Sequence, residues 1–283
     1  MPSKDLTIRT VQTVLNGSYR FSTRLSGYLT YQVLVRPPKH EAEPAEEAFI
    51  AKAETAYLTD EELQLATYHW PGSGPKILLA HGWDSYSGRW YELAERLLAA
   101  GFDLYALDAP AHGHTSGGQF SVHRYAQSMT TAMHAIKPDI LIGHSAGGMA
   151  AVYYFHQFQA PVRPERMVLL GTPGELTDFV ESFRRVLGLS HRTIAAMDDY
   201  FVKRWDHPIA YYSVSEFAKI LRLPGLVIHD EDDDVAPYAG ALAITNNWAE
   251  AELMTTQGLG HSLQSEAVWQ RIVDFCLAGQ EER

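Results

Sequence analysis

The chain has 283 residues, of which 46% are hydrophobic and 20% charged, and 23 Lys and Arg against 34 Asp and Glu give a formal net charge of −11. This composition is typical of a globular protein with one large core, and it excludes a disordered chain, a collagen and a coiled coil. Because the sequence is acidic and has no cluster of Lys and Arg, it argues against a nucleic-acid or anionic-membrane partner. We therefore expect a small ligand that is neutral or apolar.

Cysteine use and the absence of long apolar stretches bear on the compartment. Cys276 is the only cysteine, so no intramolecular disulfide can form and nothing indicates an oxidising compartment. The first ten residues hold no apolar region typical of a signal peptide, and no later stretch is apolar for long enough to span a membrane. We expect a cytoplasmic protein without a membrane span.

Residues 1–50 precede the regular pattern of the chain. They contain apolar residues and tyrosines that fit one or two helices, followed by Arg36-Pro37-Pro38 and an acidic run from Glu41 to Glu47. We interpret this segment as an N-terminal helical arm. It can pack on the core of its own chain or on a second subunit, and the second arrangement predicts a homodimer.

From residue 51 onward the sequence predicts a sheet covered by helices. Two weaker strands are expected around residues 53–58 and 63–70. Six short apolar runs follow, typical of parallel strands buried on both faces, at residues 76–81, 102–107, 139–143, 166–171, 225–229 and 251–256. Between them lie apolar residues at helical spacing, around Trp90–Leu97, Val122–Ile136 and Val268–Phe275. This alternation predicts an α/β fold with a mostly parallel twisted sheet and helices on both faces, formed by residues 51–172 and 223–283.

The segment 173–222 interrupts this alternation. Residues 172–175, Thr-Pro-Gly-Glu, have the spacing of a capping box with Pro at the first helical position. A helical face follows, made of Leu176, Phe179, Val180, Phe183 and Leu187. We predict a helical cap or lid insertion. Its aromatic content fits a lid over a pocket and a small packed subdomain equally well, the residues being Tyr200, Phe201, Trp205, Tyr211 and Tyr212 together with Met197.

The most informative residues are 143–147, which read Gly-His-Ser-Ala-Gly. They follow a predicted buried strand and precede an apolar helical stretch, the context in which Gly-x-Ser-x-Gly carries a nucleophile. Glycine on both sides removes Cβ atoms that would collide with the backbone of a tight, strained turn. A helix N-terminus also favours developing negative charge. We predict that Ser145 is a nucleophile, with a structural serine as the alternative.

A serine hydroxyl near its ordinary pKa is a poor nucleophile, so this interpretation requires a base and a group that orients the base. Two loops at the ends of predicted strands offer them. The first is His229–Pro237, which contains five consecutive acidic residues, and the second contains His261. Both follow strands at the edge where open α/β sheets place their sites.

Together these stretches resemble the α/β-hydrolase fold superfamily. The resemblance covers about residues 50–283 apart from the insertion, and it rests on His81-Gly82-Trp83, on residues 108–113, on the Ser145 turn and on the two loops. Aligning this sequence with the family's Gly-x-x-Asp-x-x-Val-Pro pattern at Pro237 implies that the acid is Asp233. The loop departs from that pattern, because Asp230 stands where the family usually has Gly and Ala236 where it has Val. Two alternatives for the acid stay open, Asp232 and Asp234.

The resemblance also implies an oxyanion hole made by the backbone N–H groups of Trp83 and Ala146. Two such donors lower the barrier by binding the oxygen of a tetrahedral intermediate. We expect no cofactor and no metal, since the acidic run lacks the spacing of a calcium loop and the histidines around His112 form no zinc pattern. His112 is expected to hydrogen-bond a loop below the site, and His144 to be a packing residue.

These residues predict a serine hydrolase that cleaves a carboxylic ester or thioester through an acyl-enzyme, with Ser145, His261 and Asp233 as the catalytic triad. The aromatic insertion suggests an apolar acyl or aryl group in the small-molecule substrate. One alternative keeps the triad and changes the bond, as in C–C hydrolases, lactonases and perhydrolases. Another alternative is a non-catalytic binding protein with the same fold.

Overall fold

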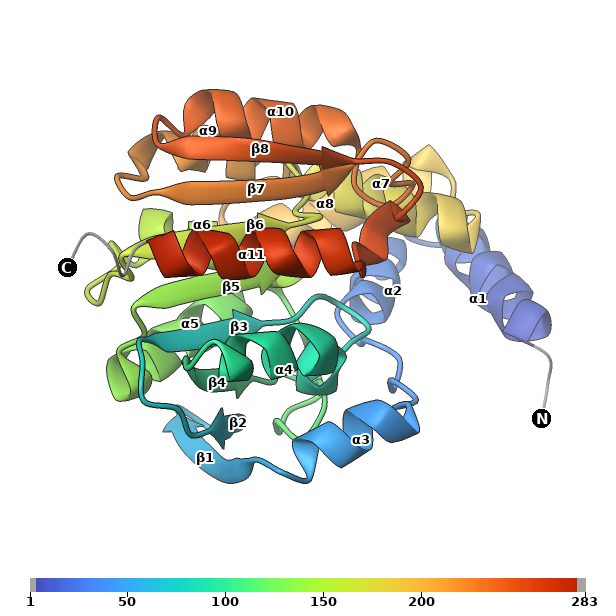
Figure 1. The fold of residues 1–283 in the computed structure, drawn as a ribbon. Helices are drawn as coiled ribbons and strands as arrows, with labels where there is room; N and C mark the ends of the chain where they lie inside the picture. Colours follow the sequence, from blue (N-terminus) through green and yellow to red (C-terminus); the bar gives the residue numbers. More distant parts are fainter. Residues whose placement is uncertain (1–3, 279–283) are drawn as a thin grey trace. The chain divides into compact units, whose positions relative to one another are not determined.

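The computed structural model describes residues 4–278 (Figure 1). Its described part divides into two compact units. The first, which we call the sheet unit, consists of residues 37–174 and 214–278. The second, the helical unit, consists of residues 4–36 and 175–213. Within residues 4–278, no helix combines the length and the apolar character that crossing a membrane requires.

The sheet unit is built on eight strands in the order β1-β2-β4-β3-β5-β6-β7-β8 (Figure 1). β3 to β8 run parallel to one another, and at one edge β2 pairs antiparallel with β4 and with β1. The strands are β1 Glu54–Asp60, β2 Leu63–Trp70, β3 Lys76–Ala80, β4 Asp103–Leu107, β5 Ile140–His144, β6 Arg166–Leu170, β7 Gly225–Asp230 and β8 Ala251–Thr256. The six predicted apolar runs are the six parallel strands, so the predicted α/β fold class is confirmed.

Helices cover both faces of this sheet (Figure 1). α4 (Tyr91–Ala99) and α11 (Glu266–Ala278) lie on one face, and α5 (Val122–Ile136), α6 (Ala146–Gln157) and α10 (Tyr238–Asn247) lie on the other. The apolar stripes predicted around Trp90, Val122 and Val268 are the buried faces of α4, α5 and α11. Shorter elements are α3 (Pro44–Ile50), η1 (Ser87–Trp90), α9 (Val214–Phe217), η3 (Ala218–Ile220) and η4 (Gly260–Ser262).

The helical unit joins two segments that are far apart in the sequence. Its elements are α1 (Lys4–Ser18), α2 (Thr23–Leu34), α7 (Leu176–Leu187), α8 (His191–Trp205) and η2 (Ile209–Tyr211). Tyr31 of α2 packs against Tyr200 of α8, with ring centroids 5.2 Å apart, and its hydroxyl accepts a hydrogen bond of 3.2 Å from Trp205 Nε1. Asn16 of α1 accepts a 2.8 Å bond from the N–H of Ser190. The aromatic residues of the insertion therefore serve a packed subdomain shared with the N-terminal arm.

Two details differ from the sequence analysis. The capping box predicted at residues 172–175 is wrong, because α7 begins at Leu176 and its N-cap Glu175 makes no side-chain capping bond. Thr172 is instead buried against Gly148, at a contact so close that a Cβ there would lie 2.0 Å from the Thr172 hydroxyl. The end of the expected arm also belongs to the sheet unit, since Phe49 of α3 stacks on Trp70 of β2 with centroids 4.3 Å apart.

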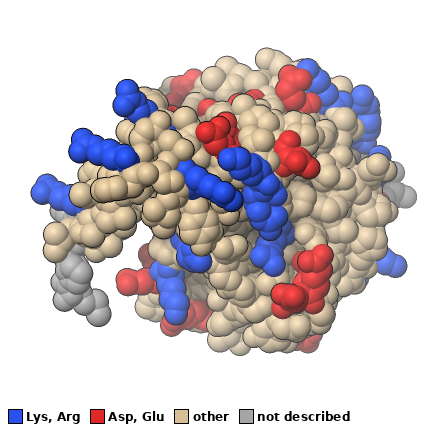
Figure 2. Space-filling model, turned by 180° about the vertical axis from the view of Figure 1, so that it is seen from behind, with Lys and Arg blue, Asp and Glu red and all other residues tan. Residues whose placement is uncertain are grey.

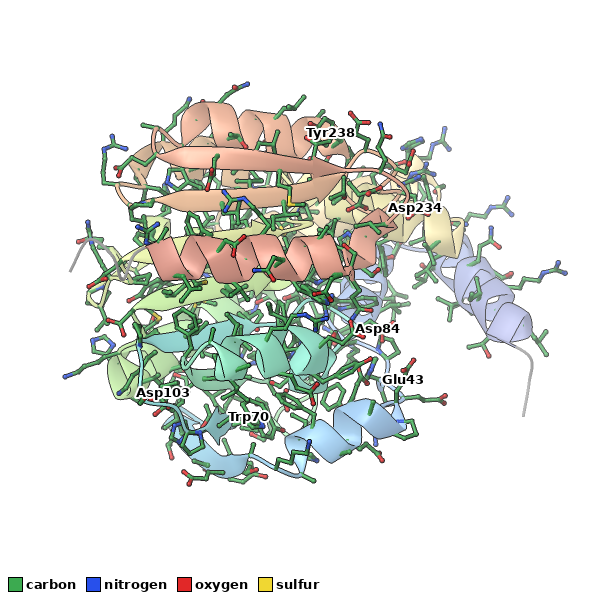
Figure 3. All side chains as sticks on the ribbon, viewed as in Figure 1. Glu43, Trp70, Asp84, Asp103, Asp234 and Tyr238 are labelled. Atoms are coloured by element: carbon green, nitrogen blue, oxygen red, sulfur yellow. The ribbon has the colours of Figure 1, made fainter. Side chains whose placement is uncertain are left out.

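The parallel strands bring their following loops to one edge of the sheet. In Figure 3, Asp84 and Asp234 lie at the edge where the parallel strands end, and Asp103, the first residue of β4, lies at the opposite edge. Strand direction alone therefore collects the loops after β3, β5, β7 and β8, which carry the sequence-predicted site residues.

Candidate active site

Ser145 occupies a strained turn between β5 and α6. Its backbone has φ +52° and ψ −119°, a conformation that a residue with a side chain rarely adopts. The surrounding glycines make the turn possible, because a Cβ on Gly147 would lie 2.2 Å from the Ala80 carbonyl oxygen and one on Gly143 would lie 2.7 Å from the backbone of Gly148. The Ser145 N–H donates to the carbonyl of Leu170 on β6 over 2.8 Å, which ties the turn to the neighbouring strand.

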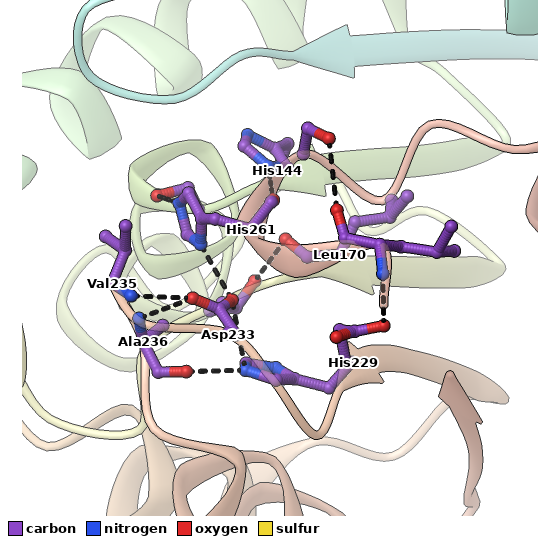
Figure 4. Close-up of polar contacts among 12 residues, drawn as sticks. His144, Leu170, His229, Asp233, Val235, Ala236 and His261 are labelled. Atoms are coloured by element: carbon purple, nitrogen blue, oxygen red, sulfur yellow. Dashed lines mark hydrogen bonds and ion pairs between the residues drawn. The ribbon is translucent and has the colours of Figure 1, made fainter. Parts of the chain in front are cut away.

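The structure brings Ser145, His261 and Asp233 together in one chain of hydrogen bonds. Figure 4 shows the contact between His261 and Asp233. His261 Nε2 lies 2.9 Å from Ser145 Oγ, and His261 Nδ1 lies 2.8 Å from Asp233 Oδ2. An ionised carboxylate only accepts hydrogen bonds, so Nδ1 carries the proton and Nε2 is left as the acceptor for the serine hydroxyl. This is the arrangement in which an imidazole can remove the proton of a serine.

The environment of Asp233 keeps it ionised. Its side chain is fully buried, and Oδ1 accepts hydrogen bonds from the N–H groups of Val235 and Ala236 over 2.9 and 2.8 Å. Burial by itself raises the pKa of this carboxyl, but the bond to His261, the charge of His261 and the two backbone amides outweigh it and lower the pKa below its usual value. His229 Nε2 lies 3.4 Å from Oδ2 and 2.8 Å from the Ala236 carbonyl oxygen, which closes the loop around the carboxylate (Figure 4).

The neighbouring acidic residues have other contacts. Asp230 is fully buried and accepts hydrogen bonds from the Thr256 hydroxyl over 2.6 Å and from the N–H of Leu259 over 3.0 Å. Asp232 Oδ2 accepts a bond of 3.1 Å from the N–H of Gly258. These two carboxylates therefore hold the loop that carries His261 in place. The sequence pattern gave no sign of this role, because the two loops are far apart along the chain.

Two further side chains support the backbone of the His261 loop, and the sequence analysis missed both functions. His144 Nε2 donates to the His261 carbonyl over 2.9 Å, and it stays neutral because burial, followed by the charge of Arg89, lowers its pKa well below the usual value. Arg89 Nη2 donates to the Ser262 carbonyl over 3.2 Å. Arg89 is buried, and burial lowers the pKa of its guanidinium to about 10. Their adjacency to His261 could not be read from the sequence, because it arises from loops of three different strands.

The loop after β3 packs against the Ser145 turn. A Cβ on Gly82 would lie 2.9 Å from the Cβ of Ser145, so glycine is needed for this close approach. His81 anchors the loop: Nδ1 donates to the Gly82 carbonyl over 2.7 Å, and Nε2 accepts from the N–H of Ala109 over 2.9 Å. Burial lowers the pKa of His81 to about 3, which keeps it neutral. Trp83 follows directly. Ala146 is the first residue of α6, and the N–H groups in the first turn of a helix have no partner inside the helix.

His112 lies in the loop after β4 and hydrogen-bonds at both ring nitrogens. Nδ1 donates to the Pro110 carbonyl over 3.0 Å, and Nε2 accepts from the N–H of Asp84 over 3.2 Å. Burial, with a smaller contribution from His81, lowers the pKa of His112 to about 3. His112 thus hydrogen-bonds the loop after β3, as a structural histidine.

A cavity of about 530 Å³ lies in the sheet unit, between the loops after β3 and β4 and the segment that leads into α3. Ser85 and Tyr86 border it two and three residues after Trp83, and His112 borders it from the loop after β4. His40 contributes a further wall, with its ring 5.2 Å from that of Tyr86. The walls thus combine aromatic surface with several hydrogen-bonding groups.

The chain is similar to two protein families and to several individual proteins. Residues 74–213 match the family model described as serine aminopeptidase, S33, and residues 205–283 match that of TAP-like protein. The chain is 26% identical over 247 aligned positions to a monoacylglycerol lipase of Mycolicibacterium smegmatis, covering 72% of this chain and 88% of that protein. It is 35% identical over 92 residues to a pimeloyl-[acyl-carrier protein] methyl ester esterase of Vibrio vulnificus, a match that covers 30% of this chain and 33% of the relative.

Two solved structures illustrate the likeness in fold. Est1E from Butyrivibrio proteoclasticus, determined with ferulic acid bound, superposes with a TM-score of 0.66 at 18% identity, covering 79% of this chain and 98% of that one. An esterase of Pyrococcus furiosus superposes with a TM-score of 0.65 at 17% identity, covering 86% and 99%. At this identity the likeness establishes the fold alone. Together with the family matches, it shows that the chain belongs to the α/β-hydrolase fold superfamily and is a hydrolase.

Proposed function

We propose that the protein hydrolyses a carboxylic ester through an acyl-enzyme, with Ser145 as nucleophile, His261 as general base and acid, and Asp233 as the group that orients the base. The observation that carries the proposal is the continuous hydrogen-bond chain from Ser145 Oγ through both nitrogens of His261 to Asp233. The ionised state of Asp233 supports the required tautomer of the imidazole.

In the first half of the reaction, Ser145 Oγ attacks the ester carbonyl carbon while its proton passes to His261 Nε2. The carbonyl oxygen becomes an oxyanion, which the N–H groups of Trp83 and Ala146 bind. Removing one such donor typically costs about 3 kcal/mol of transition-state stabilisation. The bond to the alcohol oxygen then breaks, and His261 returns the proton to that oxygen, so the alcohol leaves and the acyl group stays on Ser145.

In the second half, a water molecule takes the place of the alcohol. His261 accepts a proton from the water as its oxygen attacks the acyl carbonyl, and the bond to Ser145 Oγ breaks as the proton returns to the serine. The carboxylic acid is released and the enzyme is restored. Asp233 stays ionised throughout and stabilises the imidazolium that forms twice in the cycle.

An apolar acyl chain on the substrate is supported by the relatives. The matches include a monoacylglycerol lipase over most of its length and a methyl ester esterase over a third of its length. The aromatic residues that first suggested an apolar acyl or aryl group pack against one another in the helical unit, so they no longer argue for it. We therefore propose esters of medium or long acyl chains with a small alcohol.

Labelling with a fluorophosphonate tests the nucleophile. Wild-type protein, Ser145→Ala and His261→Ala are incubated with the probe and examined by intact mass and peptide mapping. We expect one adduct, on the peptide that contains Ser145, and its loss in both variants. Ser262→Ala is the matched control, because this serine neighbours His261 and its exposed hydroxyl donates to the Leu259 carbonyl, away from Ser145 and Asp233. Undiminished labelling of Ser145→Ala would overturn the assignment.

A substrate panel then tests the bond that is cleaved. Monoacylglycerols and methyl esters of increasing acyl length are compared with a thioester, a lactone and a diketone that requires C–C cleavage. We expect kcat/KM to be highest for the oxygen esters and to rise with acyl length. Faster turnover of the diketone or the lactone would show that the enzyme cleaves a C–C bond or a lactone rather than the proposed ester.

A further inference from the structure

The N-terminal arm has a charge opposite to that of the rest of the chain. Residues 1–36 contain five Lys and Arg and a single acidic residue, a net charge of +4, which leaves −15 for the remaining residues. The net charge of the whole chain therefore hides a basic segment. Figure 2 shows blue Lys and Arg side chains standing out along the helices of the helical unit, with tan surface between them.

The same segment exposes large apolar side chains. Phe21, in the turn between α1 and α2, is 88% exposed, the highest value among the exposed large hydrophobic residues of the described chain. Val14 on α1 and Leu25 on α2 are 54% and 46% exposed. A groove of about 420 Å³ between these helices continues the apolar surface, lined by Thr10, Val11, Val14, Leu15, Leu29, Gln32, Val33 and Arg36.

Arginines flank this apolar surface. Arg20 immediately precedes Phe21, Arg24 precedes Leu25, and Arg9 lies on α1; all three are exposed. Among the residues whose side chains the structure describes, no ion pair is found for any of the three. Their charges are therefore directed to solvent, and an apolar tip with basic neighbours is the composition of an interfacial membrane anchor.

We propose that the turn between α1 and α2 docks the enzyme on an anionic lipid surface. Phe21 and Leu25 enter the boundary between headgroups and acyl chains, and Arg20 and Arg24 bind the lipid phosphates. A second copy of the chain fits the surface less well, because a two-fold interface brings the same arginines face to face. The docking is independent of the Ser145 chemistry, since none of these residues belongs to the site.

Vesicle binding of the full chain tests the proposal. Wild-type protein is sedimented with phosphatidylcholine vesicles, with and without phosphatidylglycerol. We expect binding to the anionic vesicles that weakens with added salt, because exposed charges are screened. The double variant Arg20→Glu, Arg24→Glu reduces the partition coefficient at least twenty-fold, at about five-fold for each arginine removed. Phe21→Ser reduces it about ten-fold or more, since it loses the burial of an aromatic ring.

Matched controls come from the sheet unit. Tyr57→Ser removes an aromatic side chain that is 54% exposed on β1, and Arg163→Glu reverses an exposed arginine. Both are expected to bind as the wild type does. Every variant is also assayed on a soluble short-chain ester, where unchanged kcat/KM shows an intact fold and separates this test from that of the proposed function.

Three outcomes would overturn the proposal. The first is equal binding to neutral and anionic vesicles, and the second is no binding to either. The third is a homodimer, measured by light scattering without lipid, that Phe21→Ser dissociates, because this would assign the apolar surface to a second copy of the chain.

Discussion

At the scale of single residues, five adjacent carboxylates at positions 230–234 have distinct environments. Asp233 contacts His261, whereas Asp230 and Asp232 accept hydrogen bonds from the backbone that precedes His261. Sequence alone left Asp232, Asp233 and Asp234 open, because the direction of each side chain depends on the path of the loop. The distance of 2.8 Å to His261 Nδ1 favours Asp233 as the orienting acid.

We predict that Asp233→Asn lowers kcat by about four orders of magnitude with little change in KM. The N–H groups of Val235 and Ala236 hold the amide oxygen at the Oδ1 position, so the amide NH2 faces His261 Nδ1 and donates to it. The imidazole then loses the tautomer that accepts the serine proton. The measurement is steady-state kinetics on the best ester of the substrate panel, corrected for active enzyme by phosphonate titration.

The matched controls for this prediction are Asp232→Asn and Asp234→Asn, which remove a charge from the same loop. Both are expected to keep kcat within about ten-fold of wild type, because neither replaces the group that contacts His261. If one of them were the damaging change and Asp233→Asn mild, the acid would have to be reassigned.

At the scale of elements, the loops after β7 and β8 are held together by Asp230. Its two oxygens accept from the Thr256 hydroxyl and from the N–H groups of Leu259 and Asp232, which belong to both loops. Burial raises the pKa of Asp230, but these hydrogen bonds lower it below the usual value, so the carboxylate is ionised. These hydrogen bonds give a structural reason for Asp230 at a position where the α/β-hydrolase family usually has glycine.

We predict that Asp230→Asn destabilises the fold by about 1–3 kcal/mol, since an amide group would face backbone donors inside a closed site. The free energy of unfolding is measured in urea, and kcat per titrated site shows whether the position of His261 is affected. Glu231→Gln is the control, because Glu231 lies in the same loop but is exposed. Equal stability of the two variants would contradict the role of Asp230.

At the scale of the whole molecule, buried histidines make the stability depend on pH. Burial lowers the pKa of His81 and of His112 to about 3, and it also lowers the pKa values of His144 and His229. The unfolded chain protonates its histidines below about pH 6.5. It therefore binds more protons than the folded chain, and stability is lost as the pH falls from that value toward 3.

We predict that the free energy of unfolding falls by about 2 kcal/mol for each fully buried histidine between about pH 7 and pH 5. Asp230 and Asp233, whose pKa values are lowered, add a loss of the same sign below about pH 4. Urea unfolding followed by tryptophan fluorescence at a series of pH values measures the slope.

Two variants identify the groups responsible for this slope. His112→Gln keeps a donor and an acceptor but cannot titrate. The number of protons taken up on unfolding, which sets the slope of the free energy of unfolding against pH, should therefore decrease by about one. His134→Gln replaces an exposed histidine of α5 and is the matched control. A free energy of unfolding that is constant from pH 7 to pH 5 would contradict the prediction. It would show that the buried histidines bind protons equally in the folded and unfolded states.

Local pattern was sufficient to predict the strands, the main helices and the tight turn that carries Ser145. The runs at β3 to β8 are apolar because both faces of a parallel sheet are covered, and Gly143 and Gly147 flank Ser145 because the turn leaves no room for Cβ atoms. These constraints act over a few neighbouring residues, so the amino-acid sequence displays them directly. The start of α7 was predicted a few residues too early. Residues Thr172 to Glu175 have the spacing of a capping box, but they form a loop in which Thr172 packs on Gly148.

Contacts between distant segments were decided only by the tertiary structure. The association of Asp230 with Leu259 and of Arg89 with Ser262 joins loops that are far apart in the sequence, and the pairing of Tyr31 with Tyr200 joins the arm to the insertion. No periodicity records such pairs, because each depends on the direction in which two loops or helices meet. The sequence by itself therefore determined the layers of the fold and the candidate nucleophile, and the tertiary structure decided which carboxylate reaches the base and which residues hold the base in place.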